Sequence, residues 1–122
     1  MHSIKAIATV IFFFLLGVQL FAQHHNQREM SAEQKAEKRT SNMTETLELT
    51  EDQRKEVYQI NLTAAEELKA LDNEKLTADE RRRKKKQVAM DTRKKLSSVL
   101  TDEQMEKMKS AMKERRHEKK RR

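Results

Sequence analysis

The sequence is almost free of the residues that interrupt helices. It contains no proline, and its one glycine is Gly17. Glycine commonly closes a helix and proline ends or bends one. A chain without them can stop a helix only at capping residues or at an occasional asparagine, so the caps should set the helix boundaries.

Four capping motifs follow one another along the chain. In each, a serine or threonine can accept a hydrogen bond from the backbone amide three residues later, where glutamine or glutamate can bond back. The motifs begin at Ser31, Thr50, Thr77 and Thr101. They predict helices near 31–46, 51–72, 78–99 and 102–118, with Asn73 closing the second in the left-handed conformation. The short links predict antiparallel neighbours, with the third helix beside the second.

Each predicted helix carries one narrow apolar stripe, which is clearest over 51–72 and poorest over 78–99. Residues 23–122 contain 27 apolar side chains, of which only 12 are leucine, isoleucine or valine. That is too few for a self-contained globular core. Paired long helices can stay ordered if they share their seam with a second subunit. We therefore expect an all-α protein, with four helices in an elongated antiparallel hairpin or cradle that forms a homodimer.

The last helix carries three methionines on one stripe, Met105, Met108 and Met112. One interpretation is that they form the seam against Val57 and Ile60. The other is that these flexible, polarizable side chains face a binding partner.

The first 22 residues have the pattern of a cleavable secretory signal. Lys5 precedes an apolar run over 6–21, and the small Ala22 ends it. A membrane anchor is the alternative, because the run is nearly long enough to span a bilayer. Export predicts a periplasmic location, and without cysteine the chain has no disulfide and no cysteine for lipid attachment. The expected organisation is signal peptide 1–22, flexible leader 23–30, helical domain 31–112 and basic tail 113–122.

Two of the capping motifs are copies of one phrase, Leu49-Thr50-Glu51-Asp52-Gln53 and Leu100-Thr101-Asp102-Glu103-Gln104. A repeated Leu-Thr-x-x-Gln motif in a small exported helical chain resembles the Spy/CpxP family of periplasmic proteins, and the match spans residues 47–112. The resemblance implies a dimeric helical cradle. It also implies one of two activities, an ATP-independent chaperone or an accessory inhibitor of an envelope-stress sensor kinase. The motif residues expected to maintain the helix starts are Leu49, Thr50, Gln53, Leu100, Thr101 and Gln104.

Charge is distributed unevenly along the chain. Residues 23–80 carry 8 basic and 14 acidic side chains, whereas residues 81–122 carry 18 basic and 6 acidic ones. Part of this charge can pair between neighbouring helices, but six consecutive cations on one helix cannot all find partners. A basic surface dotted with apolar side chains suits unfolded or misfolded envelope proteins, because long-range attraction speeds encounter. The expected client-binding residues are Arg81, Arg82, Arg83, Lys84, Lys85, Lys86, Met90 and Arg93.

The remaining chemistry in the sequence is sparse. No catalytic constellation can be assembled, so we expect no enzyme and no cofactor. The adjacent His24 and His25 and the distant His117 have poor spacing for a metal site, although a metal-responsive accessory role is a third hypothesis. Nucleic acid is an improbable partner for an exported chain without a recognised motif. The basic run from Arg115 to Arg122 could contact anionic lipid weakly.

Overall fold

The computed structural model describes residues 29–122, which form four α-helices and no β-strand. The predicted all-helical class is confirmed, and three helices match their predicted ranges within one residue at each end. The last helix continues three residues beyond its predicted end at 118. The predicted signal peptide and residues 23–28 of the leader lie outside the described residues. The helices are α2 (Ala32–Leu47), α3 (Glu51–Asp72), α4 (Ala78–Val99) and α5 (Asp102–Arg121).

Every helix begins at a predicted cap. In all four boxes the hydroxyl of the cap residue accepts from the backbone amide three residues later, and the side chain at that later position accepts from the cap's own amide. Each box satisfies two donors that would otherwise lack a partner at the helix start. None of the helices within residues 29–122 is long and apolar enough to cross a membrane.

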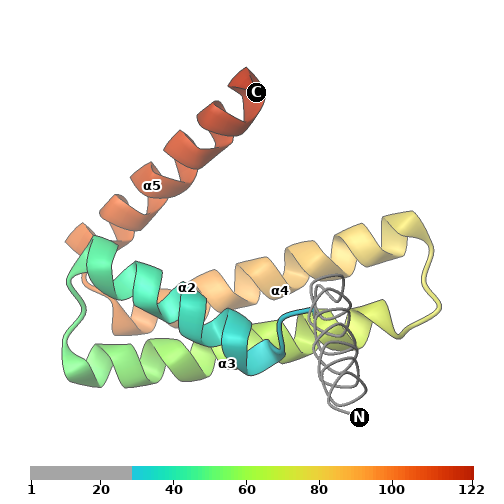
Figure 1. The fold of residues 1–122 in the computed structure, drawn as a ribbon, viewed down its shortest axis with the longest axis horizontal. Coiled ribbons are helices and arrows are strands. Elements are labelled where there is room, and N and C mark those ends of the chain that lie inside the picture. The colour runs from blue at the N-terminus through green and yellow to red at the C-terminus, as the bar shows by residue number, and fades with distance from the viewer. Residues whose placement is uncertain (1–28) are drawn as a thin grey trace, which may run out of the picture.

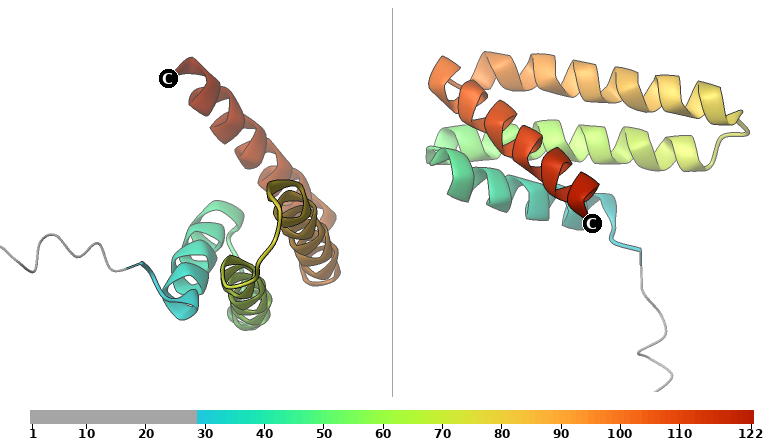
Figure 2. Two further views of the ribbon diagram at one scale, coloured as in Figure 1. Left: turned by 90° about the vertical axis from the view of Figure 1, so that its right-hand side faces the viewer. Right: turned by 90° about the horizontal axis from the view of Figure 1, so that it is seen from above.

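Three of the helices form one layer. Figure 1 shows α3 and α4 as long antiparallel neighbours, with α2 packed against α3, and Figure 2 shows α3 between the other two. The prediction that the basic third helix lies beside the second is therefore confirmed. After Leu100 the chain leaves this layer, and α5 crosses towards α2 before its C-terminal half projects outward.

The main hydrophobic cluster lies where the α2–α3 and α4–α5 links meet. Its buried members are Leu47, Val57, Leu96 and Leu100. Met105 and Met108 pack against it, as does the half-buried Ile60. The seam interpretation of the α5 methionines is thus confirmed for Met105 and Met108. None of the residues of α5 is fully buried. The attachment of α5 to the other helices therefore depends on this short contact.

A buried polar pair joins α2 to α3 further along their contact. The Asn61 amide nitrogen donates to the Thr40 hydroxyl at 3.0 Å, and both side chains are almost completely buried. Asn61 Oδ1 is buried without a hydrogen-bond partner among the described residues. Because a buried amide is costly unless it is paired, this contact favours the one alignment of α2 and α3 that brings Thr40 to Asn61.

The prediction for Asn73 was wrong. Asn73 has φ −91° and ψ −8°, in the right-handed region, and its amide donates to the carbonyls of Ala70 and Leu71. The left-handed residue is instead Glu48, with φ 54°, at the end of α2. Leu47 is buried and Leu49 packs against the same cluster, so the exposed residue between them takes the turn.

Candidate ligand-binding groove

The two repeated motifs meet in space through their glutamines. Gln53 Nε2 donates to Gln104 Oε1 at 2.8 Å, and Gln104 Nε2 donates back to Gln53 Oε1 at 3.1 Å. The two amides therefore form a reciprocal pair between residues 51 positions apart in the sequence. Each glutamine also caps its own helix, because its Oε1 accepts from the amide of Thr50 or Thr101.

The remaining amide hydrogens satisfy helix C-termini. Gln104 Nε2 donates to the carbonyl of Leu47, the last residue of α2, at 3.2 Å. Gln53 Nε2 donates to the carbonyl of Val99, the last residue of α4, at 3.1 Å. A glutamine amide can donate twice and accept twice, and all four capacities are used in both side chains. Two glutamines thereby tie together the ends of all four helices.

This arrangement explains why glutamine, and not glutamate, stands in the repeated motif. The box of α4 uses Glu80 and the box of α2 uses Gln34, because capping alone needs only an acceptor. At positions 53 and 104 a carboxylate could still cap, but it could not donate to the partner or to the carbonyl. The motif is therefore an anchor that holds the start of α5 against the end of α2.

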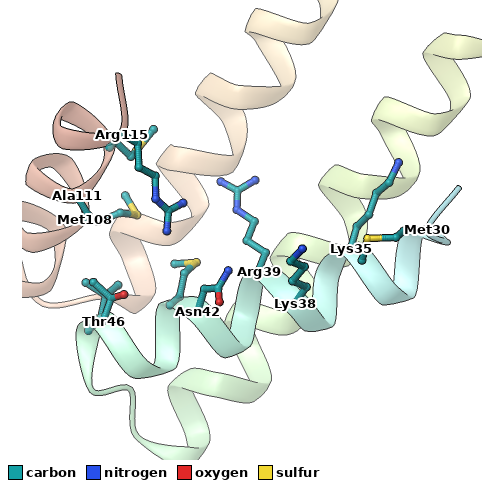
Figure 3. Close-up of a pocket in the computed structure, with 12 residues that line it drawn as sticks. Met30, Lys35, Lys38, Arg39, Asn42, Thr46, Met108, Ala111 and Arg115 are labelled. Atoms are coloured by element: carbon teal, nitrogen blue, oxygen red, sulfur yellow. The ribbon is translucent and has the colours of Figure 1, made fainter. Parts of the chain in front are cut away.

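A groove opens between α2 and α5 beyond this anchor (Figure 3). Its volume is about 440 Å³, within the range of small-molecule sites. The two helices diverge with distance from the anchor, as Figure 1 shows, and the groove lining extends from Leu47, beside the anchor, to Met30, which precedes α2. Its lining consists of Met30, Lys35, Lys38, Arg39, Asn42, Met43, Thr46, Leu47, Met108, Ala111, Met112 and Arg115.

The chemistry of the lining changes along the groove. On α2, lining residues one turn apart run from Leu47 through Met43 to Arg39. On α5 they run from Met108 through Met112 to Arg115 in the same direction, away from the anchor. These two rows thus begin apolar and become cationic about two turns, or roughly 12 Å, further on. The uncharged polar Thr46 and Asn42 lie beside the apolar part of the row on α2.

All four ionisable side chains of the lining are cationic: Lys35, Lys38, Arg39 and Arg115. Within residues 29–122 no salt bridge joins any of them to a carboxylate. Partial burial of the guanidinium and the nearby charge of Arg115 both lower the pKa of Arg39. The Arg39 residue as a whole remains exposed, so solvent screens this effect and the group stays protonated.

Arg39 also borders two smaller depressions. One, of about 100 Å³, includes Leu68, Val88, Arg93 and Met112. The other, of about 200 Å³, includes the buried Asn61 beside Lys35 and Lys69. Asp72 is the one carboxylate in the lining of these two depressions. The three hollows form a predominantly basic, apolar-floored surface that is centred on Arg39.

The predicted client-binding residues of α4 occupy several different environments. Arg81 closes the end of α3, since its guanidinium donates to the carbonyls of Leu71 and Glu74 and to Asp72 Oδ1. Arg82 pairs with Asp79 at 3.2 Å, and Lys84 pairs with Glu74 at 2.9 Å. The solvent-exposed members of the set without an ion pair in the described chain are Arg83, Lys85, Lys86 and Arg93, together with Met90.

Of this predicted set, Arg93 alone lines one of the three hollows. The groove itself is lined by Met30 and by residues of α2 and α5, none of which belongs to that set. Among them, only Met108 and Met112 had been considered as partner-facing side chains, in the second interpretation of the methionine stripe. The available signal was the spacing of Lys35, Arg39, Met43 and Leu47, which places cations and apolar side chains on one helix face at intervals of four and predicts a mixed surface.

No group of three or more histidine, cysteine, aspartate or glutamate side chains within residues 29–122 could hold a metal ion. His24 and His25 lie outside the described residues, and His117 lies on the exposed end of α5.

The chain belongs to the DUF4890 family, a domain of unknown function, which matches residues 22–122. No curated protein matches the sequence, and no solved structure matches the fold. The resemblance to the Spy/CpxP proteins therefore still rests on the two Leu-Thr-x-x-Gln motifs.

Proposed function

We propose that this protein is a periplasmic, ATP-independent holdase that binds partly unfolded polypeptides and limits their aggregation. The observation that carries the proposal is the groove between α2 and α5, whose apolar lining is mainly methionine and leucine and whose ionisable lining is entirely cationic. The repeated motif, shared with the Spy/CpxP proteins, agrees with this class of function.

The groove suits varied segments better than one fixed sequence. Methionine side chains are flexible and polarizable, and they adapt to different apolar shapes. The surrounding cations attract acidic segments over long range, and salt screens that attraction. Binding through adaptable apolar contacts and screened charge attraction is weak and fast to reverse, as a holdase requires.

The exposed cations of α4 extend this surface. Arg83, Lys85 and Lys86 are solvent-exposed, and Met90 is 55% exposed beside them in the sequence. We assign the three cations to long-range attraction of clients, while the groove supplies close contact. Arg93 borders the hollow of about 100 Å³ on the α4 side and contributes to both long-range attraction and close contact.

The proposal includes a cradle made of two antiparallel copies. The buried hydrophobic residues among 29–122 number eight, three of which are alanines, so one subunit has a small core. Residues 23–80 have a net charge of −6 and residues 81–122 one of +12, which favours contact between opposite halves of two chains. Analytical ultracentrifugation at micromolar concentration tests this part, because a stable monomer would contradict it.

Light scattering of two unrelated unfolding clients tests the function. The native protein should suppress aggregation of both clients, and the suppression should weaken as salt rises. The variant Arg39→Gln/Arg115→Gln should lose most of the protection. The matched control Arg83→Gln/Lys85→Gln removes the same charge from α4, and it should slow capture while leaving saturating protection largely intact.

Two results would contradict the proposal. Failure to protect either client at a molar excess would exclude a general holdase. Tight one-to-one binding of a sensor-kinase domain together with that failure would favour the regulatory function instead. Equal loss of protection in both charge variants would remove the groove as the specific contact site.

A further inference from the structure

The part of the groove between the glutamine anchor and Arg39 has the form of a site for a small amphiphile. Its Leu47 end lies beside the glutamine anchor, which donates to the Leu47 carbonyl, and against the hydrophobic cluster on which Met108 packs. Arg39 and Arg115 follow about two turns further on, and their side chains extend from opposite walls in Figure 3. Depth in the groove therefore corresponds to a change from apolar to cationic lining.

The guanidinium groups of Arg39 and Arg115 lack a counter-charge in the described chain. The charge of Arg115 is close enough to lower the pKa of Arg39, and neither side chain forms a salt bridge within residues 29–122. Two like charges on facing helices repel, and a bound anion would replace that repulsion with two attractive contacts. Guanidinium groups match carboxylates particularly well, because their donors can bind both oxygens.

From these observations we infer that the groove binds a free single-chain anionic amphiphile, such as a long-chain carboxylate. The carboxylate lies between Arg39 and Arg115, and the alkyl chain runs past Met43 and Met112 towards Leu47. The apolar stretch is roughly 12 Å long, which a medium-length chain of carbon–carbon bonds of ~1.5 Å can fill. This ligand is separate from an unfolded polypeptide, so the inference stands without the proposed holdase function.

The charge of the lining selects against other amphiphiles. A quaternary ammonium head group would meet four cations and no carboxylate in this lining. An uncharged alcohol would leave the repulsion between Arg39 and Arg115 in place. A double-chain phospholipid in a bilayer would present its head group at the membrane and keep its chains there, so a membrane surface would use the exposed basic end of α5 instead of the groove.

Isothermal titration of the purified protein with dodecanoate, below its micelle-forming concentration, tests the inference. We expect one molecule bound per chain. The variant Arg39→Gln/Arg115→Gln should bind at least about tenfold more weakly, because each charge-assisted hydrogen bond contributes on the order of one tenfold step. The matched variant Arg83→Gln/Lys85→Gln should change the affinity by less than about twofold, because exposed, distant charges are screened.

A second pair of variants tests the alkyl path. Met112→Gln places a polar amide in the groove without adding charge, and it should weaken dodecanoate binding severalfold. Met90→Gln makes the same change at an exposed methionine of α4 and should leave the affinity unchanged. Circular dichroism of each variant should match the native spectrum, which separates a lost site from a lost fold.

Three results would overturn the inference. Dodecyltrimethylammonium could bind as tightly as dodecanoate, or both charge variants could lose affinity equally, and either would reduce the effect to nonspecific attraction. The third result would come from sedimentation with phosphatidylglycerol vesicles, with which Arg39→Gln/Arg115→Gln should still sediment. If this variant lost vesicle binding together with dodecanoate binding, the two arginines would belong to a membrane-binding surface and not to a site for a free amphiphile.

Discussion

Gln53 and Gln104 each use their whole hydrogen-bonding capacity on the other and on the helix ends beside them. Their mutual hydrogen bonds measure 2.8 and 3.1 Å, and each side chain also accepts from a cap amide and donates to a terminal carbonyl. The repeated motif therefore has a structural role that neither copy indicates on its own. It fixes where α5 leaves the layer, and that position opens the groove.

The first prediction concerns the amide of Gln53. Gln53→Glu keeps the capping acceptor but removes both donated hydrogen bonds, so the protein should lose about 1–3 kcal/mol of unfolding free energy. Gln34→Glu makes the same change in the box of α2, where the side chain only caps, and it should stay within about 0.5 kcal/mol of native. Urea denaturation measures both. Equal effects would show that the reciprocal pair contributes nothing beyond capping.

The second prediction concerns the buried contact between Thr40 and Asn61. Thr40→Val removes the acceptor of the Asn61 amide and should cost about 1–3 kcal/mol. Adding Asn61→Leu should recover most of that loss, because a buried apolar pair has no unmet hydrogen bonds. Thermal or urea unfolding gives the comparison, and a double variant that is less stable than Thr40→Val alone would argue against it.

Arg81 and Arg83 provide a third, paired prediction. Arg81 donates to the Leu71 carbonyl in the last turn of α3 and to the Glu74 carbonyl just beyond it, whereas the exposed Arg83 has no ion pair in the described chain. Arg81→Gln should therefore destabilise the α3–α4 turn by about 1 kcal/mol, while Arg83→Gln should be nearly neutral. Hydrogen exchange of the amides around Asn73 locates the effect. Similar amide protection in both variants would mean that Arg81 does not stabilise the end of α3 and belongs instead to the solvent-exposed basic surface.

The fourth prediction is a pH dependence at the start of α4. Hydrogen bonds from the backbone and hydroxyl of Thr77 lower the pKa of Glu80 below its usual 4.5. A carboxylate with a lowered pKa stabilises the folded state above the unfolded value, and this contribution is lost as pH falls through the folded value. Glu80→Gln should flatten the decline in stability below about pH 4.5. An unchanged acid profile would assign that decline to other carboxylates, such as Glu33.

Helix starts could be predicted from the sequence because capping is local. The boxes at Ser31, Thr50, Thr77 and Thr101 need only residues three positions apart, and all four formed as predicted. Helix ends were harder to predict from the sequence. Glu48 is left-handed because its two leucine neighbours pack inward, and Asn73 stays right-handed where Arg81 completes the hydrogen bonding at the end of α3.

The groove could not be predicted because it depends on contacts between distant residues. Nothing local in either motif indicates that Gln53 pairs with Gln104, and without that pair the path of α5 is undetermined. The basic run on α4 stood out by charge density alone. The cations at Lys35, Arg39 and Arg115 become one site only when α2 and α5 meet.

Methionine methyl NMR is the most direct test of the central claim, that ligands bind between α2 and α5. The described chain carries natural reporters inside the groove, Met30, Met43, Met108 and Met112, and two outside its lining, the exposed Met90 and the core-packed Met105. Addition of an unfolded client should shift the methyl signals of Met43, Met108 and Met112 and leave that of Met90 nearly unmoved. Shifts confined to Met90, with the groove methionines unchanged, would contradict the account.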